Sequence, residues 1–279
     1  MKTETLDEGR LTVAVEFLPL LAAGGLDSFD KIMALPGGTV ARDFPGRRTV
    51  RLELKAPHGG VLGVYLKRYE PNYLSGWGRL FRLLRWPGAE DEALREWQAI
   101  QQVAAAGIRT ARPIAIGQRR SRGMVTRSFL MTAEIPGAVE GHVHIESLPA
   151  TERRSFLLRV GEMARRLHEA GLVHKDFYVG HVLVTPNPSG AELFLIDLQR
   201  AVKPWLLFSR WVAKDLGALG YSMFNAGATY TDLLRTFLAY RQSAMLGEAE
   251  KCQARKVLRR IFRLRRRQPR HGGPVRQRE

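Results

Sequence analysis

Residues 174–197 read HKDFYVGHVLVTPNPSGAELFLID, and the spacing of the polar residues in this stretch sets the interpretation of the whole chain. Asp176 stands two residues after the first His, and His181 follows five residues later. Apolar runs flank this loop and predict short buried strands. The last run, residues 193–196, ends at Asp197, so polar side chains are predicted to gather at strand ends.

This arrangement is typical of the catalytic loop in kinase-fold phosphotransferases. Phosphoryl transfer needs little covalent chemistry and much positioning of charge around the transferred group. Asp176 would accept the proton of the acceptor hydroxyl, and His181 and Asp197 would face the metal ion that bridges the nucleotide phosphates. Each Asp taken alone is more typical of a turn, since Asp is common where strands end. The prediction therefore rests on the three residues together.

The composition indicates one large or two small globular lobes. The chain has 279 residues, of which 45% are hydrophobic and 25% charged, enough for a sizeable core. No window approaches the ~18 uninterrupted apolar residues of a spanning helix. The acidic start MKTETLDEGR is unlike a secretory signal, so we expect a cytoplasmic protein. A single cysteine, Cys252, excludes an internal disulfide.

A net charge of +17 and a pI near 10.7 imply an anionic partner. The excess lies in the C-terminal tail, where Glu279 is the only acidic residue after position 250. Apolar residues alternate with Arg there, which predicts a basic amphipathic helix over about 249–267. Such a helix could lie on an anionic membrane surface or pack its apolar stripe on the domain. The tail has one aromatic residue and no base-reading motif, so the pattern disfavours nucleic acid.

Residues 129–135 form a strand pattern that ends at Pro136-Gly137, the predicted connection between a small N-terminal and a larger C-terminal lobe. ATP adenine would dock against backbone near Glu134. Further patterns predict strands at 50–54 and 61–69 and helices at 89–106, 151–170, 211–224 and 230–241. The basic, aromatic segment 76–87 could contact a phosphorylated or lipid-linked acceptor or pack on the N-lobe.

Lys67 and Glu96 form the second predicted constellation. In kinase folds a strand lysine binds the nucleotide phosphates and is held by a carboxylate on the following helix. Lys67 lies in the predicted 61–69 strand and Glu96 in the next helix, where Glu92 is an alternative. In the C-lobe, Asp215 is predicted to accept backbone N–H bonds from the catalytic loop, a structural role.

The phosphate loop is less sharply marked, because the chain contains no GxGxxG motif. Gly37, Gly38 and Gly46 either form this loop or simply make turns. Arg47 and Arg48 could replace the phosphate contacts that a glycine-rich backbone would otherwise supply.

With these residues placed, the chain resembles the lipopolysaccharide kinase (Kdo/WaaP) family, and most closely its inner-core heptose kinase branch. The resemblance spans roughly residues 35–241. It is carried by ordered motifs: Tyr65-Leu66-Lys67, Gly76-Trp77-Gly78, residues 96–100, 106–108 and 128–134, the HKDFYVGHVLV loop, Ile196-Asp197-Leu198-Gln199-Arg200 and Lys214-Asp215-Leu216.

The resemblance implies an α+β, protein-kinase-like bilobal fold with a small β-rich N-lobe and a larger, mainly helical C-lobe. It implies a kinase that uses ATP and Mg²⁺ to phosphorylate a sugar hydroxyl, of heptose in the closest branch, in the lipopolysaccharide core at the cytoplasmic face of the inner membrane. Asp176 matches the catalytic base; Lys67, Glu96, Glu134 and Arg48 are the expected nucleotide-binding residues; Asp197 and His181 are the expected metal residues. Mg²⁺ prefers oxygen ligands, so His181 could instead orient Asp176 or bind a phosphate.

We expect four segments: an N-terminal extension (1–34), the N-lobe (35–136), the C-lobe (137–248) and a basic tail (249–279). Expected partners are the lipopolysaccharide core glycolipid and the anionic inner-membrane surface, with the protein peripheral on that membrane. Two alternatives stay open, a protein kinase and a catalytically silent membrane or scaffold module. The short span from Asp197 to Asp215, without an Ala-Pro-Glu motif, favours a small or lipid-linked acceptor over a protein.

Overall fold

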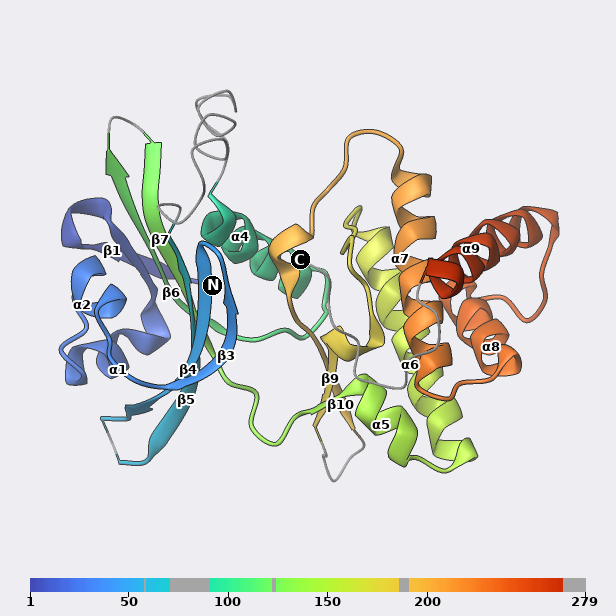
Figure 1. Ribbon diagram of the computed structural model, residues 1–279, viewed down its shortest axis with the longest axis horizontal. Coiled ribbons are helices and arrows are strands. Elements are labelled where there is room, and N and C mark those ends of the chain that lie inside the picture. Colours follow the sequence, from blue (N-terminus) through green and yellow to red (C-terminus); the bar gives the residue numbers. More distant parts are fainter. Residues whose placement is uncertain (58, 71–90, 122–123, 186–190, 268–279) are drawn as a thin grey trace. The chain divides into compact units, whose positions relative to one another are not determined.

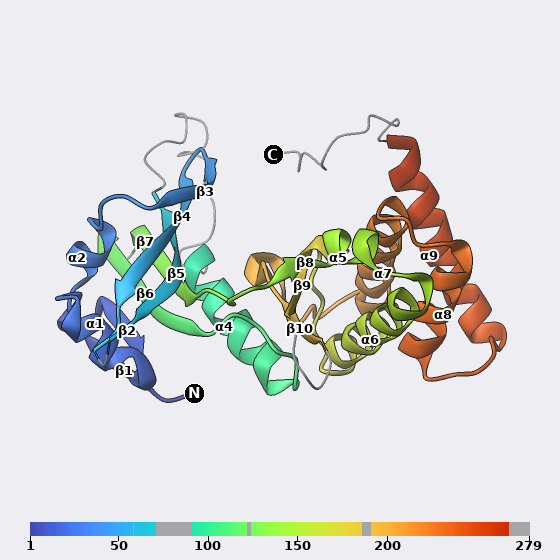
Figure 2. The same cartoon turned by 90° about the horizontal axis from the view of Figure 1, so that it is seen from below.

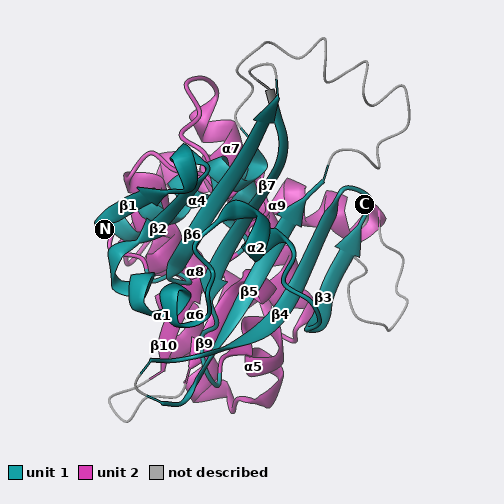
Figure 3. Ribbon diagram, turned by 90° about the vertical axis from the view of Figure 1, so that its left-hand side faces the viewer, with its two compact units in different colours: residues 1–105, 109–137, 197–200 teal, residues 106–108, 138–196, 201–279 magenta. Residues whose placement is uncertain are grey.

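The computed structural model describes residues 1–57, 59–70, 91–121, 124–185 and 191–267, which divide into two compact units (Figures 1 and 3). Unit 1 comprises residues 1–105, 109–137 and 197–200, and unit 2 comprises residues 106–108, 138–196 and 201–279. The basic, aromatic segment 76–87 lies outside the described residues.

A seven-stranded antiparallel sheet in the order β1-β2-β6-β7-β5-β4-β3 forms the body of unit 1. Its strands are β1 (Thr3–Leu6), β2 (Leu11–Ala14), β3 (Thr39–Phe44), β4 (Arg47–Lys55), β5 (Val61–Tyr69), β6 (Pro113–Ser121) and β7 (Met124–Ala133). The register sets Lys67 of β5 between Thr49 of β4 and Leu130 of β7. Each of the three strands predicted in this region is present, with β5 at the predicted bounds.

Helices cover both faces of this sheet (Figures 1 and 2): α1 (Leu18–Ala23) and α2 (Phe29–Met33) lie on one face, and α4 (Glu92–Ala105) lies on the other. Leu11 and Phe29 are fully buried in the same core cluster as Leu66 and Phe129. Residues 1–34, predicted as an extension, therefore supply two strands and part of the core of unit 1.

Helix α4 carries Glu96 and owes its place to an apolar stripe. Trp97, Ile100 and Val103 recur at three-residue spacing, which puts them on one face of a helix, and all three are buried. After the helix, Gly107 has a φ of +72°, a left-handed conformation that glycine adopts without a steric penalty. Within the described residues, the helix predicted over 89–106 is present from Glu92 to Ala105, and Gly107 lies just beyond its end.

In its described residues, unit 2 combines a three-stranded antiparallel sheet, in the order β10-β9-β8, with helices α5 to α9. Its elements are β8 (Val139–Glu140), β9 (Val182–Thr185), β10 (Glu192–Leu195), α5 (Gly141–Ser147), α6 (Ala150–Glu169), α7 (Phe208–Asn225), α8 (Tyr230–Arg241) and α9 (Glu248–Arg267). The helices predicted for the C-terminal part are all present. Short 3-10 turns, η4 (Val179–His181) and η5 (Leu198–Arg200), precede β9 and follow Asp197.

The basic helix α9 packs against α7 through two glycines. A Cβ on Gly217 would lie 2.4 Å from Arg260 Cγ, and one on Gly220 would lie 2.7 Å from Ile261 Cδ1, so only glycine permits this approach. Val257 and Ile261 are buried at this contact. Part of the apolar stripe of the predicted tail helix is therefore used for packing, while Leu258 and Phe262 of the same helix are 38% and 47% exposed. None of the helices in the described ranges is both long and apolar enough to span a bilayer.

Candidate active site

Lys67 and Glu96 meet inside unit 1. Strand β5 presents the Lys67 ammonium 2.5 Å from Glu96 Oε1 on α4, and the two side chains are 14% and 4% exposed. The Tyr69 hydroxyl donates to the other carboxylate oxygen at 3.2 Å. Burial, aided by the negative charge of Glu96, raises the pKa of the Tyr69 phenol well above its usual value. The alternative carboxylate, Glu92, is 54% exposed and lies 4.0 Å from Arg95.

Asp197 completes a charged cluster with the same lysine. Its Oδ1 lies 3.9 Å from Lys67 Nζ, and its Oδ2 accepts a hydrogen bond of 3.4 Å from Arg42 on β3. The backbone of Asp197 has a φ of +59°, a left-handed conformation that few non-glycine residues adopt. Such outliers are common where a side chain must be aimed at a ligand. The carboxylate is thus held between two cations, with 13% of its side chain exposed.

Strands β3 and β4 form a hairpin that turns at Pro45-Gly46, where Gly46 has a φ of +81°. Arg47 donates a hydrogen bond to Gln199 in the η5 turn. Arg48, which the sequence suggested as a nucleotide-binding residue, is half-exposed and lies 3.7 Å from Asp43. Arg42 and Arg47, and not Arg48, are therefore the hairpin residues that reach residues 197–200.

Glu134 follows β7 and forms a two-point ion pair with Arg51. Arg51 Nε and Nη2 donate to its two carboxylate oxygens at 2.7 and 2.8 Å. These hydrogen bonds hold the pKa of the Glu134 carboxyl below its usual value. Its backbone N–H donates to the Gly63 carbonyl at 2.8 Å. An adenine contact in this region would therefore use the Glu134 carbonyl or the residues that follow.

Asp176 lies in unit 2, on the loop between α6 and η4. Lys214 of α7 brings its ammonium to 3.9 Å from Asp176 Oδ1. Lys214 and Lys175 also lie over the Trp211 ring, 5.5 and 4.8 Å from its centre, a cation–π arrangement. The candidate base thus has a cationic neighbour whose position is fixed by an aromatic ring.

His181 is buried behind the same loop. Its Nδ1 lies 2.8 Å from the Asp176 backbone carbonyl, and because a carbonyl only accepts, Nδ1 carries the proton in this contact. The ring stacks on that of His174 with 5.7 Å between the centres. His174 Nε2 in turn lies 3.0 Å from the carbonyl of Ile196, the residue before Asp197. These contacts suit a residue that shapes the loop.

Asp215 of α7 holds the loop that carries Asp176 in place, as predicted. It is fully buried, and its Oδ2 accepts the His174 backbone N–H at 2.7 Å. His168 Nε2 lies 3.4 Å from the same oxygen. A buried carboxylate that accepts such bonds ties α7 to the residues just before Asp176.

The residues in unit 1 suit the phosphate end of a nucleotide and its Mg²⁺. Lys67 and Arg42 are cations, and Asp197 offers the carboxylate oxygen that Mg²⁺ prefers. Within the described parts of the chain, no group of three or more His, Cys, Asp or Glu residues is arranged to hold a metal by itself. Mg²⁺ in nucleotide sites commonly takes one or two carboxylates and completes its shell with phosphate oxygens and water, so Asp197 fits and His181 is a weak candidate.

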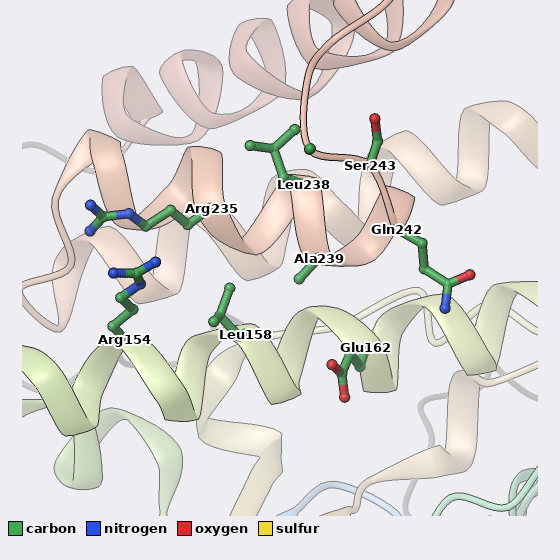
Figure 4. Close-up of a pocket in the computed structure, with 9 residues that line it drawn as sticks. Arg154, Leu158, Glu162, Arg235, Leu238, Ala239, Gln242 and Ser243 are labelled. Carbon is green, nitrogen blue, oxygen red and sulfur yellow. The ribbon is translucent and has the colours of Figure 1, made fainter.

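A pocket of about 470 Å³ lies elsewhere, between α6 and α8 of unit 2 (Figure 4). Arg154 and Glu162 of α6 and Arg235 and Leu238 of α8 are among the residues that line it. None of its lining residues belongs to either predicted constellation. Its polar lining consists of two arginines, one carboxylate, Gln242 and Ser243.

The predicted site residues fall on both units: Lys67, Glu96, Glu134, Arg48 and Asp197 in unit 1, and Asp176 and His181 in unit 2. Sequence reasoning missed Arg42 and Lys214. Arg42 lies in a mostly exposed strand without an apolar pattern, and Lys214 looked like part of a buried helix. The motif Lys214-Asp215-Leu216 was the one available signal for the second.

The comparisons with known proteins agree with one another. The model of the lipopolysaccharide kinase (Kdo/WaaP) family matches residues 37–240. The lipopolysaccharide core heptose(I) kinase WaaP of Pseudomonas aeruginosa is 33% identical over 226 residues, 77% of this chain and 81% of that protein. The enzyme of the same name from Escherichia coli K12 is 30% identical over 230 residues, 77% of this chain and 82% of that protein. A solved structure of WaaP in complex with acyl carrier protein has a TM-score of 0.70 at 27% identity and covers 95% of this chain and 99% of that one.

These matches confirm the predicted fold, with its antiparallel-sheet N-terminal part and mainly helical C-terminal part. They also confirm the predicted enzyme class, because the family and the relatives are named as kinases with a sugar acceptor. The matched region takes in both predicted constellations, from the β3–β4 hairpin to α8. The chain belongs to the lipopolysaccharide kinase (Kdo/WaaP) family.

Proposed function

We propose that the protein transfers the γ-phosphoryl group of ATP, with Mg²⁺, to a heptose hydroxyl of the lipopolysaccharide inner core. The observation that carries this proposal is the cluster of Lys67, Glu96 and Asp197, in which one buried ammonium lies beside two carboxylates. Kinase folds use this set to bind nucleotide phosphates and a metal. Heptose is preferred over other core sugars because relatives with 30% and 33% identity are named heptose kinases.

In the proposed reaction, Lys67 binds phosphate oxygens of the nucleotide, and Glu96 keeps its ammonium in place. Arg42, from the β3–β4 hairpin, adds positive charge beside Asp197, and this makes it a better placed phosphate residue than Arg48. Asp197 supplies a carboxylate oxygen to the metal. When bound, Mg²⁺ would offset the negative charge that develops on the phosphate groups during transfer.

Asp176 acts as the base. Its carboxylate takes the proton of the sugar hydroxyl while that oxygen forms a bond to the γ-phosphorus. The bond from the γ-phosphorus to the β,γ-bridging oxygen breaks, and ADP leaves with the electron pair. Lys214, 3.9 Å from Asp176, keeps the carboxylate oriented, and His181 holds the loop through the Asp176 carbonyl.

The place of action that we propose is the cytoplasmic face of the inner membrane, where the acceptor is anchored by its lipid. The net charge of +17 supports attraction to anionic lipid and to the acidic core. A protein acceptor and a catalytically silent scaffold remain the competing functions. Because one solved relative is bound to acyl carrier protein, the activity assay should be run both with and without that protein.

The test is transfer of label from γ-labelled ATP with Mg²⁺ to three acceptors: dephosphorylated core with heptose, core that ends at Kdo, and a general protein substrate. We expect label only in the heptose core. Asp176→Asn should lower the rate at least 10²-fold, the usual contribution of a general base, and Asp27→Asn, an exposed exchange in unit 1, should not. Label in protein would favour a protein kinase, and equal activity of wild type and Asp176→Asn would remove the assigned base.

A further inference from the structure

The segment 203–210, KPWLLFSR, exposes three consecutive large apolar side chains. Trp205 is 90% exposed, Leu206 55% and Leu207 62%. Isolated exposed apolar residues are ordinary on protein surfaces, but an adjacent set marks an interaction site. Lys203 and Arg210 flank the set and are exposed as well.

The exposed residues differ from the apolar residues of α9, which the sequence suggested as the membrane contact. Val257 and Ile261 of α9 are buried against α7. Residues that already pack in the core of unit 2 cannot insert elsewhere without unfolding that contact. The apolar side chains available for insertion therefore include the three at 205–207 and, on α9, Leu258 and Phe262, which are less exposed at 38% and 47%.

The segment leads directly into the helix that positions Asp176. Leu207 is the N-cap of α7, and Lys214, seven residues along that helix, lies 3.9 Å from Asp176 Oδ1. At a rise of 1.5 Å per residue, Lys214 is about 10 Å from the exposed apolar set along the helix axis. A surface bound at 205–207 would thus lie within about two turns of helix from the proposed base.

We propose that the 203–210 segment inserts into the surface of a phospholipid bilayer that contains anionic lipids. The inference rests on the proposed function, in which the acceptor sugar is joined to a lipid in that bilayer. Trp prefers the region between headgroups and acyl chains, where its ring is half in an apolar and half in a wet environment. Leu206 and Leu207 supply buried apolar area, and Lys203 and Arg210 pair with anionic headgroups.

A bilayer fits this segment better than a protein partner. The set combines one amphipathic aromatic and two aliphatic residues with cations at both ends, the composition of interfacial membrane anchors. The substrate class supplies a further reason, because inner-core sugars are attached to membrane lipid and an enzyme acting on them gains from being held at the same surface.

The experiment measures binding to vesicles of phosphatidylethanolamine with and without phosphatidylglycerol, by sedimentation. The test variant is Trp205→Ser/Leu206→Ser/Leu207→Ser. The matched control is Leu234→Ser/Met245→Ser, which removes exposed apolar side chains from other parts of unit 2. Thermal unfolding of both variants checks that unit 2 stays folded, and quenching of Trp205 by brominated lipid, with Trp205→Phe as blank, reports insertion directly.

We expect the test variant to lose at least roughly tenfold in partition to phosphatidylglycerol vesicles, since burial of each large apolar side chain contributes about that much. The control should bind as wild type does, and salt should weaken binding without abolishing it. Equal partition of test variant and wild type, or no quenching that depends on Trp205, would overturn the inference. A test variant that bound vesicles normally but lost affinity for acyl carrier protein would also overturn the inference, and would identify the 203–210 segment as a protein-binding site.

Activity on two forms of the acceptor separates this inference from the proposed function. On core oligosaccharide released from its lipid, the test variant should match wild type, and on glycolipid in vesicles it should be at least roughly tenfold slower, in line with its lost partition. Equal rates of wild type and variant on the vesicle substrate would contradict the inference alone. If wild type phosphorylated neither form, the proposed function would fail, and the vesicle-binding result would still decide whether this segment inserts.

Discussion

The ion pair between Lys67 and Glu96 gives the sharpest quantitative test of the proposed nucleotide site. Glu96→Gln keeps the size of the side chain and an acceptor for the Tyr69 hydroxyl, but it removes the charge opposite Lys67. Loss of one partner from a buried pair costs about 3–5 kcal/mol of folding stability. Because Lys67 is 14% exposed and has a second carboxylate, Asp197, at 3.9 Å, we expect the lower end, about 3 kcal/mol.

Thermal unfolding measures this cost. At about 2–4 °C per kcal/mol for chains of this size class, Glu96→Gln should unfold roughly 6–12 °C lower. Glu92→Gln is the matched control, since Glu92 lies one turn earlier on the same helix and is 54% exposed. A surface exchange of this kind changes stability by no more than about 0.5 kcal/mol. The affinity for ATP should fall with Glu96→Gln and not with the control.

A double-mutant cycle with Lys67→Met decides whether the two residues act together. Residues in direct contact show coupling energies of about 0.5–3 kcal/mol, and a 2.5 Å contact between two charged groups, each mostly buried, belongs at the upper end. Coupling below about 0.5 kcal/mol, or equal losses in Glu96→Gln and Glu92→Gln, would refute the reasoning that this pair organises the site.

Three further results are expected. Asp215→Ala should lower the free energy of unfolding by about 1–3 kcal/mol, because it leaves the buried His174 N–H without its acceptor. Asp215→Asn, which retains an oxygen, should lower it by less. Equal losses for the two variants in urea unfolding would contradict this. The hydrogen bonds from Arg51 lower the pKa of the Glu134 carboxyl, so the ion pair contributes fully to folding stability above the ordinary value of 4.5 and loses that contribution as pH falls through the lower folded value. The difference in unfolding free energy between wild type and Glu134→Gln, measured in urea, should therefore shrink to zero in acid. A difference that stayed constant with pH would contradict this role of the ion pair. His181→Ala, which leaves no ligand atom, should lower kcat without changing the Mg²⁺ concentration for half-maximal rate, and a tenfold rise in that concentration would instead make His181 a metal ligand.

The sequence predicts the site best where the candidate residues lie close to one another along the chain. Asp176 and His181 lie five residues apart, and Asp197 ends the run that follows, so their pattern is visible without any knowledge of packing. Lys67 and Glu96 could be paired because the strand and the helix each have a clear apolar period, and the order of elements is typical of one fold.

Contacts between distant, weakly patterned segments could not be read in this way. Arg42 reaches Asp197 across 155 positions from a strand in which most side chains are exposed. The short strands at residues 3–6 and 11–14 give too few residues for a periodic signal, although both join the central sheet. The place of β2 depends on pairing with β6, and that of β1 on pairing with β2, which no local pattern specifies.

For the tail helix α9, the sequence pattern predicts the helix but not the surface that its apolar face contacts. Its alternation of Arg and apolar residues predicts the helix that the structure shows, yet the pattern fits a helix on a membrane and a helix on a protein equally well. What decides between them lies in α7, where Gly217 and Gly220 leave room for Arg260 and Ile261. An amphipathic pattern predicts that one face of a helix will be buried. Whether protein or lipid buries that face depends on the surface that the helix meets. The exposed Trp205, Leu206 and Leu207 have no such period, and for that reason their exposure had to be seen in the structure before a membrane contact could be inferred from them.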